Sequence, residues 1–228
     1  MISDSRIRAR RTISRPTKDA WASLAGAATS SLSDGIGRTG SFDPGIRPVT
    51  VKTQFCGPAL TVRCRAGDNA AALAALRWIE PGDVVVLGNG GATSGALVGG
   101  NYIAMIRARG AVALVCDGPA RDLDELDEVG IPVFSRGVTP AGPFKTGPGS
   151  IGFPVAIGPI SVASGDLIFG DRDGLVHVRQ EDLVAAVDGY AAVRAREDQM
   201  ARAIAGGGIP QWLQEKLDAI EFELVDEP

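Results

Sequence analysis

The residue types best suited to chemistry stand together in one short stretch, Asp117-Gly118-x-x-Arg121-Asp122. This stretch follows residues 111–116, an apolar run typical of a buried strand, and ligands of α/β proteins collect at the carboxyl ends of strands. Arg121 offers a planar fork of donors that suits a carboxylate. Asp122 offers hard oxygen ligands for Mg²⁺ or Mn²⁺. The two side chains together could hold a small 2-oxo acid by its carboxylate and its carbonyl.

Asp122 also allows a purely structural interpretation. With Glu125 it forms Asp-x-x-Glu, the spacing of a capping box at the start of a helix. Arg121 by itself would be an ordinary surface residue. A carboxylate has two oxygens, so capping and ligand binding can coexist, and the sequence leaves both interpretations open.

Glycines are concentrated in the segment between two predicted strands. Residues 88–91 read Gly-Asn-Gly-Gly, and Gly99, Gly100, Asn101 and Tyr102 follow. Glycine lets the backbone approach a ligand closely, and amides at a helix start attract anions. The segment matches neither a P-loop nor Gly-x-Gly-x-x-Gly. Ligand contact and tight packing of a loop against the sheet therefore remain equal alternatives.

Two further acidic clusters have simpler interpretations. The run Gly170-Asp171-Arg172-Asp173-Gly174 lacks the ligand spacing of a calcium loop, and Asp-Gly is a hairpin signal, so we expect a turn there. Glu197 lies in a predicted long helix. Its local pattern is that of a solvated helix face with ordinary charge pairs.

The composition limits the chemistry that one chain can carry out. His177 is the only histidine, which excludes a zinc site with several histidines from one chain. It falls in an alternating run that predicts a strand, so we expect a strand-face residue. Acid–base catalysis would then depend on carboxylates, Lys, Tyr or metal-bound water. Cys56, Cys64 and Cys116 form no Cys-x-x-Cys pair and fit a reducing cytoplasm.

Charge and hydropathy limit the expected partners. The net charge is −4 and there is no long basic tract, so nucleic acid is not indicated. The one basic cluster consists of Arg6, Arg8, Arg10, Arg11 and Arg15. Because acidic residues flank it, residues 1–16 are interpreted as a solvated arm or an oligomer contact. No signal-peptide pattern follows Met1 and no apolar run matches a membrane span, so we expect a cytoplasmic protein without a membrane partner.

Hydrophobic periodicity predicts an α/β fold in which the pattern of secondary structure changes near residue 145. Strands and helices alternate before that point, which indicates parallel βαβ units. Short β runs and glycine turns then predict a mixed or antiparallel portion, followed by helices. Expected helices span residues 17–32, 69–78, a segment ending near 109, 123–128, 181–205 and 210–219. Expected strands span residues 59–64, 84–87, 111–116, 131–134, 154–157, 160–163, 166–169 and 175–178.

An ordered set of short motifs resembles the RraA-like superfamily. This superfamily contains regulators of ribonuclease E activity and the 4-hydroxy-4-methyl-2-oxoglutarate/4-carboxy-4-hydroxy-2-oxoadipate aldolases. The resemblance covers about residues 20–180. The motifs are Gly57-Pro58-Ala59, Pro81-Gly82-Asp83-Val84, Arg107-Ala108-Arg109-Gly110, Asp117-Gly118-x-x-Arg121-Asp122, Ile131-Pro132-Val133-Phe134-Ser135-Arg136-Gly137 and Gly165-Asp166-x-x-x-x-Asp171-x-Asp173-Gly174.

The resemblance implies an architecture and an assembly. Residues 17–180 would form a single swivelling β/β/α-type domain. Residues 181–228 would form a helical extension that packs on a neighbouring subunit. The resemblance further implies a homotrimer, or a hexamer made of two trimers, with a site between neighbouring subunits.

The same resemblance implies roles for individual residues. Arg121 would bind the substrate, and Asp122 would hold a divalent metal, Mg²⁺ first and Mn²⁺ as the alternative. Backbone amides of residues 99–102 would contact the oxo-acid end. Glu197 would reach the site from a neighbouring subunit. Many members carry an acidic residue where this chain has Gly100, which puts aldol cleavage of large branched substrates in question.

These features favour a metal-dependent carbon–carbon lyase that acts on a small 2-oxo acid through a pyruvate enolate. The reaction would be aldol cleavage of 4-hydroxy-4-methyl-2-oxoglutarate, decarboxylation of oxaloacetate, or both. A non-catalytic regulator that binds a ribonuclease is the competing class, because fold does not fix function. A related lyase or dehydratase of sugar acids is a third alternative. The intact Arg121-Asp122 pair and the chain beyond residue 180 favour the enzyme.

Overall fold

Four parallel strands form the centre of the computed structural model, which describes residues 6–223 and 225. They are β3 (Phe55–Cys64), β4 (Val84–Gly88), β5 (Ala113–Ala120) and β6 (Val133–Val138). β4 is buried along its whole length, as expected for a strand covered on both faces. The strand order is β1-β7-β3-β4-β5-β6-β2, where β1 is Ile7–Ala9, β7 is Gly149–Ile151, and β2 (Arg47–Pro48) is antiparallel to β6.

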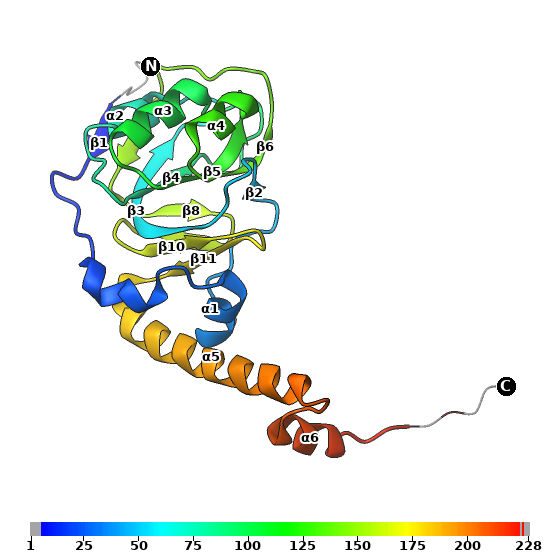
Figure 1. Ribbon diagram of the computed structural model, residues 1–228. Helices are drawn as coiled ribbons and strands as arrows, with labels where there is room; N and C mark the ends of the chain where they lie inside the picture. The colour runs from blue at the N-terminus through cyan, green and yellow to red at the C-terminus, as the bar shows by residue number, and fades with distance from the viewer. Residues whose placement is uncertain (1–5, 224, 226–228) are drawn as a thin grey trace.

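Three short helices cover one face of this sheet (Figure 1). They are α2 (Ala70–Ala75), α3 (Gly100–Ala108) and α4 (Leu123–Val129). Gly110 and Gly130 follow α3 and α4 with φ of 92° and 75°, backbone that glycine adopts without a steric penalty. The helix–strand alternation predicted from the sequence is confirmed, although α2 ends before residue 78.

A smaller β layer covers the other face. It contains the hairpin of β8 (Val155–Ile157) and β9 (Ile160–Val162), and the antiparallel pair β10 (Leu167–Gly170) and β11 (Leu175–Val178). β10 also pairs with the first half of β3, so the two layers share one strand. The predicted switch near residue 145 to short antiparallel strands is confirmed, and so is the hairpin at Asp173-Gly174.

β5 is longer than the sequence indicated, because its pairing with β6 continues past an irregularity after Cys116. Pro119 and Ala120 lie opposite Gly137 and Val138. Residues 117–120 therefore belong to the strand, and Arg121 is the first residue after it. This extension places the Arg121-Asp122 pair directly at the carboxyl end of a central strand.

The predicted helix over residues 17–32 is wrong as a single element. The chain forms a 3-10 helix, η1 (Lys18–Leu24), and then a separate helix, α1 (Thr29–Gly35). Gly26 adopts a φ of 79° between them, which breaks the helix. Asp171, from the turn between β10 and β11, accepts hydrogen bonds from both Thr29 N and Thr29 Oγ1 and so fixes where α1 begins.

The N-terminal arm is not simply solvated. β1 (Ile7–Ala9) pairs in parallel with β7 (Gly149–Ile151) at the edge of the main sheet. Further along, Arg15 binds both carboxylate oxygens of Asp83, which is fully buried. Ile7–Ala9 and Arg15 therefore have fixed partners in the domain, which a purely solvated arm would lack, and the interpretation as an oligomer contact stays a prediction.

The C-terminal extension contains η2 (Gln180–Asp182), α5 (Leu183–Ala205) and α6 (Gln211–Asp218), as predicted in outline. The first turns of α5 pack on α1, and its later turns project away from the domain (Figure 1). Gly35 and Gly189 touch by their backbones, so neither position has room for a side chain. Among the described residues, no helix has the length and apolar character needed to cross a membrane.

Candidate active site

Asp122 has an unusual backbone conformation at the junction of β5 and α4. Its φ and ψ are 61° and 46°, the left-handed region that non-glycine residues rarely adopt. Aspartate and asparagine tolerate this region better than other side chains, at a cost of about 1–2 kcal/mol. Strained backbone of this kind clusters at ligand sites, which makes the position a candidate on structural grounds alone.

The left-handed turn directs the Asp122 carboxylate away from its own helix. No side-chain cap hydrogen bond is formed to α4, so the capping-box interpretation is wrong. Instead Asp122 Oδ2 accepts a hydrogen bond of 3.2 Å from Gly100 N, at the start of α3. The same oxygen lies 3.4 Å from Arg121 Nε. The carboxylate therefore bridges the start of α3 and the guanidinium group of its neighbour.

Two consecutive glycines make room for this arrangement. A Cβ atom on Gly99 would clash with Asp122 Oδ2 and would lie 3.1 Å from Arg121 Cγ. A Cβ atom on Gly100 would clash with the Glu125 carboxylate and would lie 2.6 Å from Glu125 Cβ. The glycine segment singled out in the sequence thus packs against the Arg-Asp pair, and the pattern of glycines reflects close approach.

Arg121 lies between the glycine segment and the loop after β6. Its amide donates to Val98 O, and the Thr139 amide donates to Ala120 O just before it. Its guanidinium approaches Gly142, where a Cβ atom would lie only 2.9 Å from Nη1. The Arg121 and Asp122 side chains remain 39% and 34% exposed, so both can reach a ligand from solvent.

Asn101 and Tyr102 contribute backbone rather than side chains to this region. The Tyr102 ring is buried, and its hydroxyl donates to Ala72 O. Burial raises the pKa of that phenol, which removes it as an acid–base group near neutral pH. The Tyr102 amide donates to Gly99 O, and the Gly100 amide donates to Asp122. Asn101 is exposed in the first turn of α3, where backbone amides lack the intrahelical partner that later amides have.

The other half of the Asp-Gly-x-x-Arg-Asp motif has a structural role. Asp117 is buried and accepts two hydrogen bonds from Arg136 on β6. Arg136 also binds Asp43, and hydrogen bonds from Gly45 and Arg136 hold the pKa of Asp43 below its usual value. Sequence reasoning missed this network, although Arg136 lies in one of the quoted motifs.

The loop at residues 88–91 packs against the sheet. Asn89 is buried, and its amide nitrogen donates to Ala92 O. A Cβ atom on Gly118 would lie 2.6 Å from that nitrogen, so Gly118 makes room for Asn89. The contacts of Asn89 therefore support the packing interpretation, whereas Gly90 is exposed and a Cβ atom there would meet nothing within 4 Å.

His177 lies on strand β11 as predicted, and it is buried against Asp166. His177 Nε2 lies 2.8 Å from Asp166 Oδ2, and the amides of Ala163 and Gln180 also donate to that carboxylate. Burial alone would raise the pKa of Asp166, but these hydrogen bonds outweigh it and the pKa lies below its ordinary value. The pair is a buried structural contact remote from Arg121 in the sheet order.

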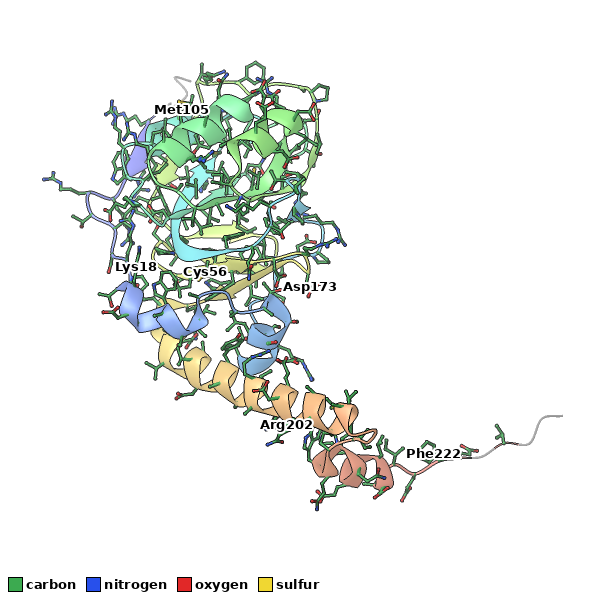
Figure 2. All side chains as sticks on the ribbon, in the orientation of Figure 1. Lys18, Cys56, Met105, Asp173, Arg202 and Phe222 are labelled. Carbon is green, nitrogen blue, oxygen red and sulfur yellow. The ribbon has the colours of Figure 1, made fainter. Side chains whose placement is uncertain are left out.

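Glu197 does not join the other candidate residues within one chain. It accepts hydrogen bonds from Ser31 on α1 and from Arg194 on its own helix. Figure 2 shows Arg202, further along the same helix, at the opposite end of the molecule from Met105 on α3. Glu197 could therefore meet the Arg121-Asp122 pair only from another copy of the chain.

The donor set at the pair fits a hard divalent cation. Among residues 6–223 and 225, no group of three or more His, Cys, Asp or Glu side chains could hold a metal. A Mg²⁺ ion keeps several waters and is commonly bound by one or two carboxylates. Asp122, whose side chain is 34% exposed at the carboxyl end of β5, supplies one such carboxylate. The described cysteines are free, and burial raises the pKa of Cys64 to about 12, so no reactive thiol competes.

Comparison with known proteins gives consistent matches. The family model described as RraA-like, Aldolase/RraA, matches residues 29–177. A protein of Halalkalibacterium halodurans, provisionally named 4-hydroxy-4-methyl-2-oxoglutarate aldolase, is 36% identical over 147 residues, which are 64% of this chain and 70% of that protein.

Two solved structures extend the match. An uncharacterized protein from Pseudomonas syringae pv. tomato is 26% identical, with a TM-score of 0.75 over 86% of this chain and 96% of that one. Streptomyces coelicolor RraAS2, described as an unusual member of the RNase ES inhibitor RraA protein family, is also 26% identical. It has a TM-score of 0.73 over 84% of this chain and 99% of that one.

Proposed function

Because the chain belongs to the RraA-like family, we propose that it is a divalent-metal-dependent lyase that acts on a small 2-oxo acid through a pyruvate enolate. The observation that supports this most directly is the Arg121-Asp122 pair beside the paired glycines at the start of α3. The provisional aldolase name of a relative 36% identical agrees with a lyase.

Arg121 binds the substrate carboxylate in this proposal. Its guanidinium is held at 3.4 Å from Asp122, yet 39% of the side chain is exposed, so it can present two parallel donors to an incoming anion. The start of α3 at Gly99 and Gly100 lies beside Arg121 and adds the positive end of a nine-residue helix. Both features favour a carboxylate over a neutral group.

Asp122 would hold the cation, Mg²⁺ or Mn²⁺. The left-handed backbone and the hydrogen bond from Gly100 fix the direction of its carboxylate before any ligand arrives. When bound, the cation supplies a Lewis acid that polarises the 2-oxo group. Preorganised charge of this kind is usually the largest contribution to catalysis.

The proton carrier in this proposal is a water molecule at the site. His177 is buried against Asp166 and does not reach the pair, and the Tyr102 hydroxyl is buried. Glu197 would approach from a neighbouring copy, because the α5 extension projects away from its own domain (Figure 1). A homotrimer, or a pair of trimers, is the assembly proposed to supply it.

The deciding experiment measures pyruvate release from oxaloacetate and from 4-hydroxy-4-methyl-2-oxoglutarate, with Mg²⁺ and with EDTA. We expect EDTA-sensitive release from at least one substrate, and at least a 100-fold lower kcat/KM in Arg121→Ala. Arg38→Ala, an exposed arginine whose ion pair among the described residues is with Asp34 across one turn, is the control. Folded protein that releases pyruvate from neither substrate would refute the proposal.

A regulator that binds a ribonuclease is the second candidate. Its support is the match to RraAS2, which covers 84% of this chain and so reaches beyond residue 180. The C-terminal extension therefore does not separate enzymes from regulators. Binding of an RNase E-type ribonuclease at submicromolar Kd by surface plasmon resonance, unchanged in Arg121→Ala, would favour the regulator.

A further inference from the structure

A cavity of about 760 Å³ opens where the N-terminal arm joins the edge of the main sheet. Its wall is formed by β1, β7, the end of β3, the loop after β4 and strand β8. A volume of this size suits a small organic molecule. The described residues that line it include neither the Arg121-Asp122 pair nor the glycines beside that pair. The cavity is therefore a second candidate site, separate from the proposed lyase site.

Arginine is the charged residue that lines this cavity. The described part of its wall contains no aspartate or glutamate and four arginines, which are Arg6, Arg8, Arg63 and Arg65. They come from two segments that are far apart in the sequence, the arm and the end of β3. A cleft lined by charges of one sign concentrates the electrostatic potential and attracts ions of the opposite sign. The cavity therefore favours an anionic ligand.

The register of the sheet directs two of these arginines to the same face. Arg8 on β1 and Arg63 on β3 both lie opposite Ser150 of β7, so the three residues form one row across three strands. Residues opposite each other in neighbouring strands project from the same face of the sheet. Val62 and Cys64, on either side of Arg63, belong to the core beneath the helices, so the row faces away from the helices.

Arg8 and Arg63 keep their guanidinium donors available. Both are exposed, and within residues 6–223 neither forms an ion pair with a carboxylate. The Arg8 guanidinium carbon lies 5.2 Å from the centre of the Phe153 ring, a contact that orients the group without neutralising its charge. Arg65 interacts electrostatically with Asp68, but that carboxylate already accepts hydrogen bonds from three backbone amides. An anion in the cavity thus has little competition for these donors.

Asn89, in the loop after β4, lines the cavity with a buried acceptor that nothing satisfies. Its side chain is 7% exposed, and Asn89 Oδ1 has no hydrogen-bond partner among the described residues. Asn89 Nδ2 donates to Ala92 O, and because a carbonyl only accepts, the amide cannot be turned round. Buried polar atoms without a partner are rare in folded proteins. A ligand that donates a hydrogen bond to Oδ1 would satisfy this atom.

Gly90 leaves open space next to Asn89. It is exposed, its φ is 74°, and a Cβ atom there would meet nothing within 4 Å. Within the described part of the chain its amide donates no hydrogen bond. Backbone amides left unpaired beside positive charges are common donors to bound anions. The open part of the glycine-rich segment at residues 88–91 thus lies at the cavity, where its backbone can contact a ligand.

We propose that this cavity binds a phosphorylated sugar or nucleotide, with its phosphate on Arg8 and Arg63 and a hydroxyl or amine group donating to Asn89 Oδ1. Guanidinium groups bind phosphate through paired, charge-assisted hydrogen bonds. An ionised phosphate only accepts, so the donor that Asn89 lacks has to come from the sugar or the base. The proposal goes beyond the lyase reaction and does not depend on it. Because one arginine lies on the arm and the other on β3, the bound ligand joins the arm to the sheet.

The first test is titration calorimetry of the full-length protein with ADP and with ribose 5-phosphate. We expect at least one of them to bind, about 10-fold or more weakly in Arg8→Gln and in Arg63→Gln, because charged hydrogen bonds are lost. Arg202→Gln, an exposed position on the projecting part of α5 (Figure 2), is the control and should stay within about 2-fold. Binding of neither probe, or equal weakening in all three variants, would overturn the proposal.

Inorganic pyrophosphate and inorganic phosphate separate the role of Asn89 from simple charge attraction. They carry the anionic groups of ADP and of ribose 5-phosphate without a sugar or a base. We expect each to bind at least about 5-fold more weakly than its organic counterpart, because Asn89 Oδ1 stays unpaired. Equal affinities would overturn the assignment of Asn89, and with it the sugar-bearing class of ligand.

An acidic surface of a second copy of the chain is the other occupant that an arginine-lined cavity can take. In that case Arg8→Gln and Arg63→Gln would shift the protein to smaller species in size-exclusion chromatography with light scattering, and neither organic probe would bind. That pair of results would overturn the proposal. We expect instead an unchanged mass, and slower tryptic cleavage after Arg8 when ADP or ribose 5-phosphate is bound.

Discussion

Asp122 Oδ2 occupies the space that a side chain on Gly99 would need. The carboxylate is held there by a hydrogen bond of 3.2 Å from Gly100 N and by a left-handed backbone at Asp122 itself. Gly99 thus shapes the proposed site without presenting any functional group, and its replacement tests the geometry directly.

Gly99→Ala should displace the Asp122 carboxylate and the Arg121 side chain while leaving the core intact. We expect at least a 100-fold loss of kcat/KM for pyruvate release, because a shift of about 1 Å in a positioned group has effects of that size. Gly137→Ala is the matched control, since a Cβ atom there meets nothing within 4 Å. Normal turnover in Gly99→Ala would show that the crowding is relieved elsewhere.

Asp122→Asn should abolish cation binding with little effect on folding. Asparagine tolerates the left-handed backbone, so the free energy of unfolding without metal should change by less than about 1 kcal/mol. Asp122→Ala combines loss of the ligand with backbone strain and should unfold more easily than Asp122→Asn. Chemical denaturation and Mn²⁺ titration of both variants measure the two effects separately. If Asp122→Asn bound Mn²⁺ normally, Asp122 would not be the metal ligand.

The sequence predicted the central part of the fold because its signals are local. Residues 84–87 are uniformly apolar, and Gly110 and Gly130 stand where helices end, so the alternation of strands and helices follows from each segment separately. The prediction of a single first helix was wrong because its boundaries depend on a contact that is distant in the sequence. Its break depends on Gly26 and on Asp171, which is 142 residues from Thr29.

The candidate site was predicted in its residues but not in its geometry. Arg121, Asp122 and the glycines at 99 and 100 are brought together, yet the spacing of Asp122 and Glu125 matched a capping box equally well. Only the left-handed backbone of Asp122 distinguishes the ligand-site interpretation from the capping box. Nothing in residues 117–125 predicts that backbone conformation. The role of Glu197 depends on a neighbouring copy, so it stays a prediction.

Arg15→Ala should destabilise the domain and release the N-terminal arm. Arg15 is 13% exposed and donates to both oxygens of Asp83, whose side chain is fully buried, so its removal leaves an uncompensated charge. Breaking such a pair costs about 3–5 kcal/mol. Urea denaturation should show that loss, and limited proteolysis should cut within residues 6–15. Arg38→Ala, from an exposed pair, should lose at most about 1 kcal/mol.

Asp166 should make stability depend on pH in the acid range. Burial by itself would raise the pKa of Asp166, but hydrogen bonds from His177 and from the Ala163 and Gln180 amides together lower that pKa in the folded protein. The folded state therefore binds a proton less readily than the unfolded chain, whose aspartates titrate near about 3.9. The resulting stabilisation is complete above that pH and is lost as the pH falls through the folded pKa.

Asp166→Asn isolates this contribution, because it keeps the shape and removes the charge that three donors share. We expect it to lower the free energy of unfolding by about 1–3 kcal/mol at pH 7, since the asparagine amide offers one acceptor oxygen in place of two and leaves a buried donor without an acceptor. The difference from the unchanged protein should shrink steadily below pH 4. Asp188→Asn, an exposed position on α5, should show neither effect. A deficit in Asp166→Asn that stayed constant from pH 7 to pH 3 would mean that lost packing, and not the lowered pKa, explains it.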